Sequence, residues 1–300
     1  MVIPEYPEFT KLRYDHKEEL IIALKKYSIE VSELSLGFLY GYNESFGFEL
    51  TKINGNICVY GIIDGIHSFL PPIGDNKITE TIELCLEILN KKYNSGRINA
   101  VPKSIVELLT ENKKFKITDD RDDYDYIYKV DDLALLKGSK YQSKRNFVLQ
   151  FKKRYKYEYR KLTKDDIQNC IELQQEWCKE NNCLDEEGIL LENRCVYELL
   201  NNFEQLNLFG AGIYIENKLK AFTVAEVFNK TTVLIHIEKA LKGFRGIYQA
   251  INNFFCEKEL LNKFEFVNRE QDAGDKGLRK SKLSYHPHHF IEKYNIELTM

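Results

Sequence analysis

The sequence lacks the short motifs that mark several well-known classes of site. It contains neither G-x-G-x-x-G nor G-x-x-x-x-G-K-S/T, which excludes the standard dinucleotide and P-loop sites. It has no G-x-S-x-G, which excludes a serine nucleophile on a strand-to-helix elbow. The net charge of -3 is also too small to indicate a nucleic-acid or membrane protein overall. An electrostatic partner would therefore have to be bound by a local patch.

The cysteines of the sequence do not follow a spacing typical of metal sites or redox-active pairs. The seven cysteines form no C-x-x-C pair, and their number is odd. Scattered thiols that serve as small core residues are typical of a reducing compartment. No apolar run approaches membrane-spanning length, and no basic segment followed by an apolar one opens the chain. The sequence therefore predicts a cytoplasmic protein with free thiols.

The hydrophobic spacing predicts strands and helices that alternate through both halves of the chain. A strand at 66–70 leads through a Pro-Pro-Ile-Gly turn to a helix at 78–93, and a strand at 233–237 leads through a glycine loop to a helix after Gly246. This shared pattern, over 66–89 and 235–259, favours two related α/β halves. The last helix is expected at 275–285, before a tail. The other expected helices are 14–27, 104–110, 165–181 and 187–203, and the other strands are 46–50, 56–63, 97–101, 124–128, 157–162, 209–216, 218–228 and 264–268.

The charge changes sign sharply between the halves. Residues 119–132 hold seven aspartates, whereas residues 133–157 hold no acid and many cations. Phe147, Phe151 and Tyr155 recur at helical spacing, which predicts an amphipathic basic helix within 138–156. We therefore expect one domain over 1–132 and a second over 133–300 that includes this linking helix.

The loop after the strand at 233–237 has the features of an anion site. The first N–H groups of a helix lack intrahelical partners, the helix dipole favours negative charge there, and Lys242 and Arg245 add two cations. The alternative is a plain β-turn-α connection with surface charges.

The order of elements from Tyr157 onward resembles the Gcn5-related N-acetyltransferase fold. Four strings resemble a bacterial family similar to the C-terminal domain of phosphatidylglycerol lysyltransferase: LKGSKYQSKRN (136–146), IEK (237–239) with RGIYQ (245–249), VNRE (267–270) and GLRKSKLSY (277–285). The resemblance implies an α/β (α+β) chain of two tandem acetyltransferase-like domains, each a mixed, mostly antiparallel sheet flanked by helices. In this tandem arrangement the chain resembles the Fem aminoacyltransferases, which move an amino acid from aminoacyl-tRNA to an amine or hydroxyl.

Acyl transfer needs a held nucleophile, a stabilised oxyanion and sometimes a base, and the residue types suggest where these would lie. The catalytic candidates Glu238, Asn268 and Glu270 end predicted strands, although an ion pair of Glu238 with Lys239 or Arg245 is an open alternative, as is a structural pair for Glu270. The donor, a coenzyme A thioester or aminoacyl-tRNA, is expected over Lys242, Gly243, Arg245, Gly246, Ile247, Tyr248 and Gln249. The candidates for substrate binding are Lys140, Tyr141, Lys144, Arg145, Asn146, Arg269, Arg279 and Lys282, and the alternative for the basic residues is a solvated helix face.

The histidines do not indicate a metal. His286, His288 and His289 have no standard zinc spacing, so no metal is expected, and His236 inside a strand is interpreted as a packed or hydrogen-bonded residue. Two functions remain open. The first is an acyl- or aminoacyltransferase acting on a small-molecule or peptide acceptor, and the second is a non-catalytic module of the same fold that binds a phosphorylated ligand or RNA.

Overall fold

The chain folds into two compact units. The computed structural model describes residues 2–27, 29–110, 112–183 and 187–299. Unit 1 comprises the residues up to Asp125, Gln271–Gly274 and the segment from Phe290, and unit 2 comprises Tyr126–Glu270 and Asp275–His289. The chain enters unit 2 at residue 126, against the expected 133, and its C-terminal segment belongs to unit 1. A single cut in the sequence therefore does not describe the units.

Unit 1 is built on a mixed, mostly antiparallel sheet. In the described part of the chain its order is β1-β2-β3-β4-β5-β14-β6, and only β4 and β5 pair in parallel. The strands are β1 (Thr10–Lys11), β2 (Glu49–Ile53), β3 (Asn56–Ile63), β4 (Ile66–Phe69), β5 (Arg97–Pro102), β6 (Phe115–Asp119) and β14 (Lys293–Leu298).

Helix α4 (Ile78–Tyr93) supplies much of the core of unit 1. Its residues Ile82, Cys85, Leu86 and Leu89 are spaced for one helical face, and all four are buried. They pack with β-strand residues in a single hydrophobic cluster. The other helices of this unit are α1 (Lys17–Lys26), α2 (Leu36–Gly41), α3 (Asn43–Phe46) and α5 (Lys103–Leu109).

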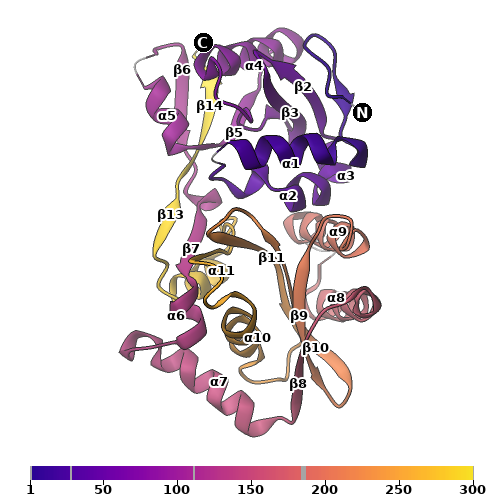
Figure 1. Cartoon of the computed structure of the whole chain (residues 1–300). Helices are drawn as coiled ribbons and strands as arrows, with labels where there is room; N and C mark the ends of the chain where they lie inside the picture. Colours follow the sequence, from indigo (N-terminus) through magenta and orange to yellow (C-terminus); the bar gives the residue numbers. More distant parts are fainter. Residues whose placement is uncertain (1, 28, 111, 184–186, 300) are drawn as a thin grey trace. The chain divides into compact units, whose positions relative to one another are not determined.

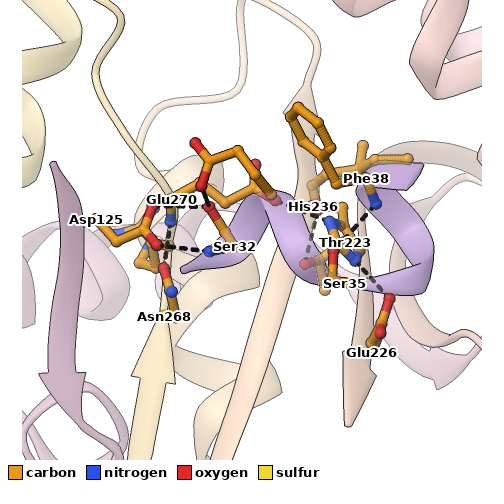
Figure 2. Close-up of polar contacts among 12 residues, drawn as sticks. Ser32, Ser35, Phe38, Asp125, Thr223, Glu226, His236, Asn268 and Glu270 are labelled. Carbon is orange, nitrogen blue, oxygen red and sulfur yellow. Dashed lines mark hydrogen bonds and ion pairs between the residues drawn. The ribbon is translucent and has the colours of Figure 1, made fainter. Parts of the chain in front are cut away.

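The predicted tail is wrong, because the chain from Lys293 forms strand β14 between β5 and β6. Lys293 is fully buried and its Nζ donates to Glu33 Oε1 at 2.7 Å, Asp125 Oδ1 at 2.8 Å and Ser32 Oγ at 3.1 Å. Ser32 donates to Asp125 through both its backbone N–H and its hydroxyl (Figure 2). Burial raises the pKa of the Glu33 carboxyl to about 8, against the attraction of Lys293. The strand is therefore anchored by charges 168 and 260 residues away in sequence.

Unit 2 is built on a second mixed sheet. Its order among the described residues is β13-β7-β12-β11-β10-β9-β8, in which β11 and β12 are parallel and β8 to β11 form antiparallel pairs. The strands are β7 (Asp125–Lys129), β8 (Tyr157–Lys161), β9 (Phe209–Ile215), β10 (Lys218–Val227), β11 (Thr232–Ala240), β12 (Phe266–Asn268) and β13 (His289–Ile291).

Helices cover both faces of this sheet. Figure 1 shows α8 and α9 on one side of β9–β11, and α7 and α10 on the other. The expected basic helix is α7, in which Phe151 is fully buried and joins a cluster with Ile247, Ile251 and Phe254 of α10. The helices are α6 (Val130–Leu135), α7 (Gln142–Arg154), α8 (Ile167–Asn181), α9 (Glu187–Asn201), α10 (Ile247–Phe255) and α11 (Lys276–Leu283).

The same supersecondary pattern occurs in each unit. In unit 1, β4 is followed by α4 and the parallel strand β5, and in unit 2, β11 is followed by α10 and the parallel strand β12. The predicted fold of two α/β halves with mixed sheets is confirmed. In the described ranges, none of the helices combines the length and the apolar character needed to cross a bilayer.

The sequence predicted that all cysteines are free, and this prediction is wrong for two of them. Cys178 and Cys183 form a disulfide. Helix α8 ends at Asn181, and Asn182 takes the left-handed conformation with φ 53°, which turns the chain back so that the two Cα atoms lie 5.0 Å apart. The free cysteines are buried, as expected of core residues: Cys58, Cys85, Cys170, Cys195 and Cys256.

Candidate active site

The candidate site lies where the parallel strands of unit 2 separate. β11 and β12 share three ladder pairs, from Thr232–Phe266 to Leu234–Asn268. β12 ends at Asn268, whereas β11 continues to Ala240 with a bulge at His236. Open α/β sheets bind ligands beyond the carboxyl ends of such strands, and bulges re-aim side chains there.

Glu238 is the centre of one polar cluster at this point. Its Oε1 accepts a hydrogen bond from Arg269 Nη2 at 2.9 Å, and its Oε2 accepts one from Asn252 Nδ2 at 3.0 Å. The ion-pair partner is thus Arg269, across the diverging strands, and not Lys239 or Arg245. Lys239 Nζ bonds Glu192 at 2.7 Å and lies 3.7 Å from the centroid of the Trp177 ring.

The cluster has unused hydrogen-bonding capacity. Among the described residues, Arg269 Nη1 and Asn252 Oδ1 are buried and have no hydrogen-bond partner. Burial alone would lower the pKa of Arg269, but the attraction of the Glu238 carboxylate outweighs this effect. The pKa of Arg269 is therefore raised overall, and the guanidinium stays charged. The side chains of Arg269 and Glu238 remain 13% and 12% exposed. A buried donor and a buried acceptor that lack partners are costly in free energy, so they are candidates to bind a polar ligand group.

His236 and Glu270 form a second cluster beside the first. Figure 2 shows the His236 ring between two carboxylates, with Nδ1 2.8 Å from Glu270 Oε1 and Nε2 3.1 Å from Glu226 Oε2. Burial lowers the pKa of His236, but the hydrogen bonds to Glu226 and Glu270 raise it to about 10. His236 is therefore an imidazolium at neutral pH, and the hydrogen-bonded histidine expected from sequence is found. Its partner Glu270 is in an ion pair, which was the structural alternative for that residue.

Asn268 and Lys282 shape the turn after β12. Asn268 Oδ1 accepts the backbone N–H of Glu270 at 2.7 Å, and Glu270 has a left-handed φ of 55°. Lys282 is buried and donates to the carbonyls of Arg269 at 2.6 Å and Glu270 at 3.1 Å. Arg279 lies half-buried on the same helix, α11. Asn268 and Lys282 therefore hold the backbone that carries Arg269 and Glu270.

The glycine loop after β11 uses several of its N–H donors within the protein. The Lys242 backbone N–H donates to Glu180 Oε2 at 2.9 Å, and the Lys242 ammonium donates to the Glu180 carbonyl. The Arg245 N–H donates to Tyr155 Oη at 3.1 Å. A carboxylate of the protein itself therefore occupies part of the place where a phosphate was expected.

The remaining residues of this loop have structural contacts. Gly243 and Gly246 have φ values of 90° and 85°, and a Cβ on Gly246 would lie 2.5 Å from the carbonyl oxygen of Phe147. The Ile247 side chain is buried in the core and Gln249 is half-buried. Tyr248 Oη accepts a hydrogen bond from Trp177 Nε1 at 2.8 Å. A role for the loop in donor binding stays a prediction.

The basic segment divides into buried and exposed members. Lys144 donates to Ser284 Oγ at 2.6 Å and lies 4.1 Å from the Tyr285 ring centroid, and burial lowers its pKa, as does the charge of Arg269. Arg145 donates to the carbonyls of Leu136 and Gly138. Tyr141 is fully buried and donates to the Tyr285 carbonyl at 3.1 Å. Their predicted role in substrate binding remains a prediction, since each already has contacts within the protein.

Lys140 and Asn146 are exposed and line a pocket with Arg245. The pocket, called here the α7 pocket, has a volume of about 470 Å³ and is lined by Ser139, Lys140, Gln142, Ser143, Asn146, Phe147, Gln150 and Arg245. Its lining has two cations, several amides and hydroxyls, and no acid, although Lys140 Nζ lies 3.8 Å from Asp132 Oδ2 outside the lining. Such a surface attracts anions.

Sequence reasoning missed Asn252, Glu226 and Trp177. Asn252 had a signal in the sequence, because the pair Asn252-Asn253 interrupts the apolar residues Ile251 and Phe254 of α10, and the structure shows Asn252 to be 1% exposed. A polar side chain on the apolar face of a helix needs a partner inside the protein. Glu226 had no comparable signal, because its contact depends on the pairing of β10 with β11.

Each unit contains one pair of parallel strands that diverge. Two such units in one chain define a protein of tandem acetyltransferase-like fold. The family described as "Phosphatidylglycerol lysyltransferase, C-terminal" matches residues 25–297, and the chain belongs to this family. No match is found among curated proteins.

Three solved structures are similar over nearly the whole chain. A conserved protein of unknown function from Bacteroides thetaiotaomicron is 32% identical, with a TM-score of 0.90 over 97% of this chain and 99% of that one. L-PGS from Bacillus licheniformis is 13% identical, with a TM-score of 0.66 over 99% and 94%. FemX is 9% identical, with a TM-score of 0.65 over 97% of both chains. The last two show the fold alone.

Proposed function

We propose that this protein is an aminoacyltransferase that takes an activated aminoacyl group from aminoacyl-tRNA and transfers it to an amine or hydroxyl. The observation that carries the proposal is the Glu238–Arg269–Asn252 cluster, with its unpartnered donor and acceptor where the parallel strands separate. The family is described by a lysyl transfer, which is a reaction of this class.

The glycine loop favours tRNA over coenzyme A as the donor. A pyrophosphate bound there would meet Glu180, whose carboxylate already accepts the Lys242 N–H. The negative charges of Glu180 and of a pyrophosphate would repel each other, so the loop is a poor pyrophosphate site. The α7 pocket offers Lys140 and Arg245 to a phosphate backbone instead, and within the described residues Arg245 has no ion-pair partner.

The transfer itself can be written with the groups of the cluster. The acceptor amine attacks the ester carbon, a C–N bond forms, the C–O bond to the ribose breaks, and the proton lost by the amine goes to the departing ribose oxygen. Arg269 Nη1 is the group suited to hold the oxyanion that forms on the carbonyl oxygen. Glu238 keeps the guanidinium in place, and Asn252 Oδ1 is suited to accept an N–H of the acceptor or of the aminoacyl group.

Binding of aminoacyl-tRNA at several salt concentrations tests the donor site. Replacing Arg245 with Gln should weaken binding and lower the slope of log Kd against log salt by about 1, because one phosphate contact is lost. Lys153→Glu is the control, since Lys153 is on α7 and exposed but does not line the pocket. Arg269→Lys should leave binding intact and lower the transfer rate by about 100-fold. An unchanged salt slope in Arg245→Gln would contradict the donor site.

A second candidate is a non-catalytic module of this fold. The specific observation in its favour is that both oxygens of Glu238 and the Glu270 carboxylate accept hydrogen bonds from protein groups. Under this alternative tRNA or another phosphorylated ligand binds the α7 pocket, and no substitution at Arg269 or Glu238 changes any turnover.

A further inference from the structure

Unit 1 contains a pocket at the place that corresponds to the candidate site of unit 2. Strands β4 and β5 share only the pairs Ser68–Arg97 and Phe69–Ile98. The chain then leaves β4 through Pro71 and Pro72, whereas β5 continues to Pro102. A pocket of about 440 Å³ lies at this carboxyl end, between the segments 26–27, 29–34, 71–75 and 102–105. Its volume is in the range of pockets for small ligands.

One part of the wall of this pocket, called here the unit 1 pocket, is apolar and rich in proline. Val31, Leu34, Pro71, Pro72 and Pro102 line it, and all of them are buried within unit 1. Proline rings fix their own backbone dihedral angles, so this part of the wall is formed before any ligand arrives. An apolar ligand body would gain free energy here by leaving water.

The rim of the pocket carries more negative than positive charge. Glu30 and Asp75 contribute carboxylates, and Lys26 contributes the one ammonium group among the lining residues. In the described residues neither carboxylate forms a close ion pair. Glu30 accepts a hydrogen bond from the hydroxyl of Ser104, and the pKa of Lys26 is raised by Tyr27 and also by the charge of Asp75. The Lys26 ammonium donates to Tyr27 Oη at 3.0 Å. The lining therefore has two acids for one base, so its net charge is negative, whereas the net charge of the α7 pocket lining is positive.

We propose that the unit 1 pocket binds a primary amine carried on a small apolar body. The ammonium would lie at the rim against Glu30 and Asp75, where it supplies the charge that the rim lacks, and the apolar body would lie against the prolines. An anion would meet a net repulsion from the same rim, and a neutral ligand would leave the rim with one carboxylate more than it has ammonium groups. The inference goes beyond the proposed transfer reaction, because the binding does not depend on unit 2 or on any turnover.

The test uses three probes of one shape and different charge. Phenethylamine, 2-phenylethanol and 3-phenylpropionate are titrated into the full-length protein, and their affinities are measured by calorimetry. We expect saturable binding of the amine at one site, with the alcohol about fivefold weaker and the acid weaker still, which is the size of effect that one partly exposed charge pair gives. Equal affinity for amine and alcohol, tighter binding of the acid, or no binding of the amine overturns the proposal.

Isosteric variants locate the site. Asp75→Asn and Glu30→Gln should each weaken phenethylamine binding about threefold to fivefold and leave 2-phenylethanol unchanged. Glu80→Gln removes an exposed carboxylate of α4 outside the pocket lining and should change neither affinity. Arg245→Gln should leave amine binding intact while it weakens tRNA binding, so the two proposals can fail separately. Amine binding that is unaffected by both Asp75→Asn and Glu30→Gln would place the amine elsewhere and overturn the assignment.

Discussion

The charge on His236 makes the stability of unit 2 depend on pH in a defined direction. The pKa of His236 is about 10 in the folded protein and 6.5 for an unperturbed histidine. A group whose pKa is raised on folding stabilises the protein fully below the unfolded value, and this contribution is lost as the pH rises through the folded value. The window for His236 is therefore pH 6.5 to about 10.

The magnitude follows from the same two values. Each pH unit inside the window removes about 1.4 kcal/mol, so the full contribution below pH 6.5 is of the order of 5 kcal/mol. This treats the Glu226–His236–Glu270 contacts as one unit, which is reasonable because the His236 side chain is only 4% exposed. His236→Gln should remove the contribution and leave two carboxylates close together.

Urea unfolding followed by tryptophan fluorescence measures the effect. Trp177 is the single tryptophan and lies in unit 2, so its signal reports on that unit. The difference in unfolding free energy between the wild type and His236→Gln should be largest near pH 6 and should shrink steadily towards pH 10. His286→Gln, at an exposed histidine of the same unit, is the control and should show no such trend. A difference that stays constant over this range would refute the assignment of a charged His236.

Two further predictions concern stability. Gly246→Ala should destabilise unit 2 by about 3 kcal/mol, because its Cβ would lie 2.5 Å from the Phe147 carbonyl oxygen at a φ of 85°, whereas Gly243→Ala has open space and should cost only about 1 kcal/mol in the same fluorescence assay. Lys293→Met should destabilise unit 1 by about 3–5 kcal/mol in urea unfolding followed by circular dichroism, since it leaves Glu33 and Asp125 without their cation, and Lys116→Met on β6 is the exposed control.

Equal effects of the two glycine substitutions would show that the approach of α7 to the loop is not a constraint. Equal effects of the two lysine substitutions would show that the buried ions are not linked as the distances indicate.

The sequence was sufficient for the elements with strong local patterns. Helix α4 and strand β11 follow from apolar spacing, and the repeated strand-helix-strand order indicated two similar halves before any pairing was known. Strand β14 was missed because its neighbours β5 and β6 are far away in sequence and its first residue is a lysine, which is typical of a surface. Only the buried acids of unit 1 make Lys293 an interior residue.

The candidate site was predictable in its members and not in its contacts. Glu238 was expected to lie at the end of a strand, but its partner Arg269 is 31 residues away and comes close only because β11 and β12 are parallel neighbours. In the same way, the sequence of the basic segment 137–156 does not indicate which of its cations face solvent. Lys144 bonds Ser284 and lies over the Tyr285 ring, both just after α11, while Lys140 stays exposed.

The choice of donor is the central claim, and thermal unfolding with candidate donors tests it most directly. A ligand that binds only the folded state raises Tm according to ln(1 + [L]/Kd). The wild type would be heated with aminoacyl-tRNA, with coenzyme A and with acetyl-CoA, each at low and moderate salt. The proposed function predicts a rise in Tm with aminoacyl-tRNA that fades as salt increases, and no rise with either coenzyme. A rise with coenzyme A or acetyl-CoA and none with tRNA would contradict it.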